Sequence, residues 1–201
     1  MEFLPAGWQY TREQLERHYR LSSCYDDADF ISNVYAQINL LQFLGKSYAK
    51  WEFEDEVKSA YCQNYLVILA SVIEAVLRKT YEKKTLWCKG HCKKGAFKIC
   101  PVVNFPIGKN GNKSIPTAKA TFFELLIAAS HDGLLEGMSE DELHQIRFAR
   151  NMVHMNAIEG DYKSEERFSS NFINKSIGIL NKVLVGCVKW LDQCEKKCLM
   201  K

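Results

Sequence analysis

Residues 139–156 carry the side chains best suited to phosphate and proton-transfer chemistry. This stretch, SEDELHQIRFARNMVHMN, holds two arginines, an asparagine and a histidine, namely Arg147, Arg150, Asn151 and His154. Guanidinium groups bind phosphate in a fixed planar geometry, and an imidazole takes up or releases a proton near neutral pH. A site that holds a phosphate group and moves a proton is therefore one prediction for this stretch.

The same stretch has the pattern of an amphipathic helix. Ser139 and Glu142 form a capping box, in which each side chain satisfies a backbone N–H group, so we expect a helix from there to about His154. With successive residues turned by about 100°, the four polar residues share one side and the apolar residues occupy the other: Ile146, Ala149, Met152 and Val153. The alternative interpretation is a polar face that is only solvated or that contacts a second copy of the chain.

One carboxylate, Glu74, lies inside the apolar run at residues 65–77. A charge that enters a core needs a partner, because removing a lone carboxylate from water is very costly. Arg78, four residues later, is the local candidate and would make an ordinary helix pair with Glu74. The alternative is that Glu74 faces Arg147 and His154 and orients one of these two cations.

Four potential metal ligands lie close together in a lysine-rich stretch: Cys88, His91, Cys92 and Cys100. Thiolate and imidazole groups are the usual ligands of a tetrahedral zinc ion, and their spacing is short enough to fold around one. The spacing matches no standard zinc-finger pattern, so the alternative is a group of reduced thiols. A structural zinc ion is a prediction that metal analysis can test.

The helices that would position these groups are indicated by their apolar periodicity. We expect a short helix at residues 12–20, a long helix capped by Asp26 and Asp27, and further helices at 54–84, 118–130, 139–154 and 164–198. The helix at 54–84 is apolar on nearly every side and should therefore be the central one.

Two of these helices carry a specific expectation about which side chains are buried. The helix at 118–130 should point four apolar side chains inward: Phe122, Phe123, Leu126 and Ile127. The last helix carries three cysteines on its apolar stripe, Cys187, Cys194 and Cys198. We expect these cysteines to be small buried side chains rather than metal ligands.

The predicted fold is all-α, an up-and-down helical bundle over residues 26–200. Residues 1–25 would be an N-terminal arm with a short helix. Residues 85–117 contain glycines, three of the four prolines and many lysines, which predicts an insertion between the second and third long helices. That insertion could contain a β-hairpin at residues 102–107.

Composition narrows the class of protein without naming a partner. The chain has 201 residues, 47% of them hydrophobic and 25% charged, as expected for one globular domain. A net charge of +3 is too small to indicate a general nucleic-acid-binding protein, so a basic surface would have to be local. No apolar run approaches the roughly 20 residues that span a bilayer, so we expect a cytoplasmic protein with no membrane association and with its eight cysteines reduced.

The segment RFARNMVHMN, set among predicted helices, resembles the signature of HEPN domains, an Arg followed after four to six residues by a His. The resemblance covers about residues 26–198. Arg147 has six residues between it and His154 and fits the signature. Arg150, the arginine that precedes an Asn, has only three and falls outside it. The resemblance therefore leaves open which arginine has the family role.

The resemblance implies a metal-independent endoribonuclease that forms a homodimer, in which two Arg and His pairs line one cleft. RNA would be the substrate, no cofactor would be required, and the site residues would be Arg147, Arg150, Asn151, His154 and Glu74. A toxin or defence role with a neutralising protein partner is a further expectation. The alternatives are a non-catalytic HEPN-like module that binds RNA, a nucleotide or a protein, and a zinc-stabilised interaction protein.

Overall fold

Three long helices form the centre of the protein. The computed structural model describes residues 9–91, 119–135, 137–138, 142, 146–147 and 170–199. The long helices are α2 (Ala28–Lys50), α3 (Asp55–His91) and α6 (Ser170–Leu199); the shorter ones are α1 (Arg12–Tyr19), the 3-10 helix η1 (Leu21–Ser23) and α4 (Phe122–His131). Every element in these described ranges is a helix, which confirms the all-α class.

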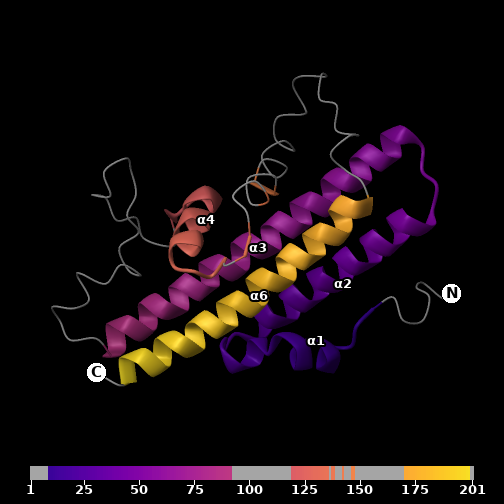
Figure 1. The fold of residues 1–201 in the computed structure, drawn as a ribbon. Coiled ribbons are helices and arrows are strands. Elements are labelled where there is room, and N and C mark those ends of the chain that lie inside the picture. Colours follow the sequence, from indigo (N-terminus) through magenta and orange to yellow (C-terminus); the bar gives the residue numbers. More distant parts are fainter. Residues whose placement is uncertain are drawn as a thin grey trace.

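Helix α3 is the central helix, as the sequence predicted. Helices α2, α4 and α6 all pack against it, and α1 packs against α6. Figure 1 shows that α2 runs antiparallel to α3, whereas α6 runs in the same direction as α3. Helix α4 lies beside α3, away from the turn that joins α2 to α3 (Figure 1).

The apolar surface of α3 is buried among its neighbours. Leu69 and Ile73 of α3 have no exposed surface, and they belong to one core cluster with Ile38 and Leu41 of α2 and Leu184 of α6. Burial from several sides explains why the sequence of this helix is apolar almost all round.

A segment of the same helix could also cross a membrane by length and composition. Among the described residues, only Ala60–Leu86 meets this criterion, which the sequence pattern alone had not suggested. Half of its apolar stretch is buried inside the bundle, and core helices of soluble proteins pass the same test. The segment therefore gives no information about location, and a cytoplasmic protein stays a prediction.

Local capping residues set the starts of the first two helices. At α1, Thr11 and Gln14 form a capping box, which starts the short helix that the sequence predicted at residues 12–20. At α2, the side chain of Asp27 accepts a hydrogen bond from the backbone N–H of Phe30 at 2.9 Å. Asp27 also binds Lys79 of α3 at 2.7 Å, so one carboxylate both starts α2 and ties it to the central helix.

The segment ahead of α2, which we expected to be a flanking arm, contributes to the same core. Leu15, Leu21 and Tyr25 are each at most 3% exposed and belong to the central cluster. The hydroxyl of Tyr19 donates a hydrogen bond to the side-chain oxygen of Asn181 on α6. The N-terminal residues from 15 onward are therefore part of the bundle.

Helix α3 ends later than the sequence predicted, at His91 rather than near Lys84. Residues 85–91 contain one glycine and no proline, so their polar side chains alone do not end the helix. The remainder of the predicted insertion, including the predicted β-hairpin at 102–107, lies outside the described residues.

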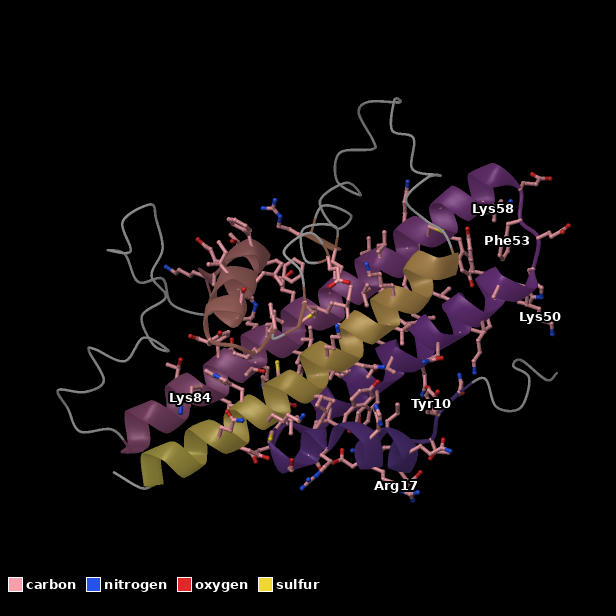
Figure 2. All side chains as sticks on the ribbon, in the orientation of Figure 1. Tyr10, Arg17, Lys50, Phe53, Lys58 and Lys84 are labelled. Carbon is pink, nitrogen blue, oxygen red and sulfur yellow. The ribbon has the colours of Figure 1, made fainter. Side chains whose placement is uncertain are left out.

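Aromatic side chains pack the turn between α2 and α3. The rings of Phe53 and Tyr61 are stacked with centroids 5.0 Å apart, and Trp51 meets Phe53 edge-on at 6.2 Å. Figure 2 shows Phe53 at this turn, with Lys50 and Lys58 on either side of it. Trp51 remains 49% exposed at this end of the bundle.

Candidate functional site

The described residues of the stretch 139–156 are Glu142, Ile146 and Arg147, and all three are helical. Ile146 is 1% exposed and belongs to the central core cluster, so the expected packing of this residue is confirmed. Arg147, the next residue, is half-buried. The remaining residues of the predicted site in this stretch lie outside the described part of the chain: Arg150, Asn151 and His154.

Arg147 packs against helix α4 through an aromatic ring. Its guanidinium carbon lies 4.4 Å from the centre of the Phe123 ring, a distance typical of a cation–π contact. The Nε atom of Arg147 is buried and has no hydrogen-bond partner among the described residues. A buried N–H group without an acceptor is unfavourable, so the described contacts leave this part of the guanidinium unsatisfied.

The sequence of α4 explains why Phe123 is available to Arg147. Thr121 and Glu124 form a capping box that starts the helix at Phe122, four residues after the start that periodicity predicted. Phe122 is buried, whereas Phe123 and Ile127 are 39% and 49% exposed. The prediction that Phe123 and Ile127 point inward is therefore wrong.

The physical reason is that α4 has apolar residues on two sides. The buried side is made of Phe122, Leu125, Leu126 and Ala129, each at most 5% exposed. Phe122 and Leu126 were correctly predicted to be buried. In such a short helix, the apolar periodicity does not indicate which of the two sides is buried.

Glu74 of α3 forms an ion pair with Arg78 at 2.9 Å, the local pairing that the sequence offered as one alternative. The same guanidinium nitrogen of Arg78 donates to the backbone carbonyl of Ala120 at 2.9 Å. Ala120 directly precedes the capping residue of α4, so this bond attaches the start of α4 to α3. Glu74 and Arg147 thus adjoin the same end of α4, Glu74 through Arg78 and Arg147 through Phe123.

We call these four residues, Glu74, Arg78, Phe123 and Arg147, the α4 site. It contains two guanidinium groups, one carboxylate and one exposed aromatic ring. Sequence reasoning named Glu74, Arg78 and Arg147 and missed the role of Phe123. No spacing signal connects residues 123 and 147, but the capping box at Thr121 was readable and would have indicated which phenylalanine starts the helix.

Helix α6 supports the segment that leads into residue 142. Lys175 forms an ion pair with Glu142 at 3.2 Å, and Lys182 donates to the backbone carbonyl of Gly137 at 3.0 Å. At Gly186, a Cβ atom would lie 2.4 Å from the carbonyl oxygen of Leu134. A glycine is required there because the backbone of the turn approaches α6 so closely.

The predicted zinc ligands are described only in part. Cys88 and His91 lie in the last turn of α3, three residues apart, which places them on one side of a helix. Their side chains, and the whole of Cys92 and Cys100, lie outside the described residues. The four-ligand zinc site therefore stays a prediction.

The cysteines that the structure describes as buried are core side chains. Burial raises the pKa of the Cys24 and Cys62 thiols, and it raises the pKa of Cys187 to about 12. Cys187 has no exposed surface, as expected for its place on the apolar stripe of α6. The side chains of Cys194 and Cys198, expected on the same stripe, lie outside the described residues.

Searches of protein-family models, curated proteins and solved structures find no match to this chain. The residues of the α4 site and the sequence of the stretch that contains Arg147 therefore carry the information about function.

Proposed function

We propose that the protein is a metal-independent endoribonuclease of HEPN type, with His154 as the general acid and base and Arg147 as the phosphate-binding residue. The single observation that supports this proposal is the set of contacts made by the Arg147 guanidinium. Its guanidinium is held on the Phe123 ring while its Nε has no hydrogen-bond partner among the described residues. A preorganised cation of this kind can stabilise charge that develops on a phosphate.

The spacing in the sequence favours the same arginine. Six residues separate Arg147 from His154, which is within the range of the HEPN signature, whereas three separate Arg150 from His154. The spacing to His154 and the contact with α4 are independent properties of Arg147. We therefore assign the family role to Arg147 and a supporting role to Arg150 and Asn151.

In the proposed reaction, the imidazole of His154 removes the proton from a ribose 2′-hydroxyl, and the resulting oxygen attacks the adjacent phosphorus. The bond from phosphorus to the 5′-oxygen breaks, and that oxygen receives a proton from an imidazolium. Arg147 holds the phosphate and balances the charge that builds on it. The reaction needs neither a metal ion nor a redox partner, and a two-fold dimer would supply a second Arg and His pair.

The deciding experiment is RNA cleavage in excess EDTA. The parent protein should cut single-stranded or loop RNA, and His154→Ala should abolish cutting. Arg147→Ala should reduce the rate on the order of a hundredfold, because it removes a contact to the developing phosphorane charge. Arg150→Ala is the matched arginine control, and Glu74→Gln should have a smaller effect than Arg147→Ala.

Two outcomes would change the proposal. A folded His154→Ala protein that cleaves as well as the parent would place the activity elsewhere. If neither protein cleaves RNA and both bind it equally, a non-catalytic binding module becomes the better description. In that case Arg147→Ala should still weaken binding, because its phosphate contact does not depend on His154.

A further inference from the structure

Helix α6 carries four lysines at a fixed spacing. Lys175, Lys182, Lys189 and Lys196 follow one another at intervals of seven residues. A step of seven residues returns to nearly the same side of an α-helix with a drift of about 20°, so the four positions fall within an arc of about 60°. Each step rises about 10.5 Å, so the four lysines extend over about 30 Å of the helix. We call these four residues the lysine row.

The lysine row lies on the outer side of the bundle. Helix α6 uses its apolar side to pack against α1, α2 and α3. Figure 1 shows α6 along the near side of α2 and α3. The three lysines of the row whose side chains are described, Lys175, Lys182 and Lys189, are all exposed. A ligand in solution can therefore reach them.

Two of these lysines form no ion pair with any described residue. Lys182 donates to the backbone carbonyl of Gly137 at 3.0 Å, and a carbonyl carries no net charge. Lys189 has no carboxylate partner among the described residues. Lys175 pairs with Glu142 at 3.2 Å, yet its side chain remains 57% exposed. The row thus presents positive charge to the solvent.

The arc of the row contains no acidic residue of α6. This helix has two, Asp192 and Glu195, and both fall outside the arc by helical register. Gln193 lies inside the arc, between Lys189 and Lys196, and is exposed and uncharged. Cations that repeat along a line with no anion between them suit a polyanion, whose charges also repeat along a line.

The chemistry of this side of α6 favours a phosphate backbone over a lipid surface. A helix that lies on a membrane presents large apolar side chains together with its lysines. Among the described side chains, the exposed large apolar ones lie on other elements, and none is on α6. Phosphates along a nucleic-acid strand need only the cations, because lysine binds them as a point charge.

The lysine row is joined to the segment that leads to Arg147. Lys175 binds Glu142 and Lys182 binds Gly137, and these partners precede Arg147 by five and ten residues. We propose that the lysine row is an extended contact surface for the phosphate backbone of the RNA strand that Arg147 contacts. This inference deepens the proposed function and rests on it. Binding to the row would be independent of sequence, dependent on salt, and stronger for long RNA than for short fragments.

The test measures binding of a fluorescent single-stranded RNA that is long enough to cover the row and cannot be cleaved because its 2′-hydroxyls are methylated. Lys189→Gln removes one phosphate contact, so the slope of log affinity against log salt should fall by about 0.7, and affinity at about 0.15 M salt should fall about fourfold. Gln193→Glu adds a carboxylate of the same size and should also weaken binding, whereas Gln193→Lys should strengthen it. Lys50→Gln is the matched control, because it removes one exposed lysine at the turn between α2 and α3 (Figure 2).

Two further ligands make the test specific. A short RNA that fills only the cleavage site should bind the parent and Lys189→Gln equally, and vesicles of phosphatidylcholine and phosphatidylserine supply an anionic lipid surface. The proposal is overturned if Lys189→Gln and Gln193→Glu bind the long RNA as tightly as the parent. It is also overturned if Lys50→Gln, or Lys189→Gln with the short RNA, shows the same loss. If the row variants keep their RNA affinity but lose binding to the vesicles, the row contacts lipid instead.

The binding assay separates this inference from the catalytic proposal. Binding of uncleavable RNA does not require His154, so an inactive protein whose RNA affinity still depends on Lys189 would refute only the nuclease. Cleavage of long RNA that needs His154 but has the same KM in Lys189→Gln and Gln193→Glu as in the parent would refute only the role of the row. Circular dichroism of each variant confirms that it is folded.

Discussion

Replacing Gly186 by alanine should damage the contact between α6 and the turn that leads to the α4 site. The new Cβ would lie 2.4 Å from the carbonyl oxygen of Leu134, and ordinary contacts begin at 3.4 Å. The turn must therefore retreat by about 1 Å, and overpacking of this kind costs about 1–3 kcal/mol. Alanine also stabilises a helix relative to glycine by about 1 kcal/mol. The measured loss in the free energy of unfolding is therefore smaller than the cost of the clash.

Gly178 provides the matched control on the same helix. A Cβ atom added there meets nothing within 4 Å, so Gly178→Ala should gain the helix-propensity term alone. The two variants should thus differ by the full clash, about 1–3 kcal/mol in the free energy of unfolding. In a protein of this size that difference corresponds to roughly 2–12 °C in the melting temperature.

The assay is thermal and urea unfolding of both variants, followed by circular dichroism. If Gly186→Ala is as stable as Gly178→Ala, the carbonyl of Leu134 does not approach α6 closely enough to exclude a Cβ atom. RNA cleavage by both variants should be measured as well, because Gly137 and Glu142 lie between this turn and Arg147 and are also bound to α6. Under the proposed function, Gly186→Ala should therefore lower cleavage while Gly178→Ala leaves it unchanged.

Two further predictions concern groups outside the α4 site. Cys24, Cys62 and Cys187 have raised thiol pKa values because they are buried, and for Cys187 the pKa is about 12. Peptide mass spectrometry after alkylation at about pH 8 should find all three protected in the native protein and labelled once guanidinium unfolds it; rapid native labelling of Cys187 would contradict its burial. Burial alone would raise the pKa of Glu16, but hydrogen bonds from Ser22 and Tyr35 lower it below its ordinary 4.5. The folded-state pKa is thus below the unfolded one, so Glu16 stabilises the protein above about pH 4.5, and this contribution is lost as the pH falls through the folded-state value. The stability deficit of Glu16→Gln should consequently shrink in acid, and a deficit that stays constant from neutral pH to about pH 3 would show that the pKa is not lowered.

Local sequence signals predicted most of the described helices. The capping box at Thr11 and the cap at Asp27 depend on residues three positions apart, so one short segment is enough to read them. The central position of α3 followed from its apolar composition. Its end was placed too early because lysines and a glycine were taken as a break, although a helix tolerates both on an exposed face.

The arrangement of the α4 site could not be predicted in the same way. Arg78 reaches Ala120, 42 residues later, and Phe123 meets Arg147 across two elements. Such contacts depend on how helices pack, and the sequence of either partner carries no sign of the other. The exposure of Phe123 and Ile127 was missed for the same reason, since only tertiary packing decides which apolar side of a short helix is covered.

The bond between Tyr19 and Asn181 has a consequence for the order in which the chain folds. These residues are 162 positions apart, and Cys24 similarly meets the backbone of Val188 on α6. During synthesis, α1 leaves the ribosome long before α6, so its apolar residues cannot pack against α6 until that last helix has been made. Closing contacts of such high sequence separation is slow. Newly made chains should therefore expose the surface between α1 and α6 to chaperones until the last helix has docked.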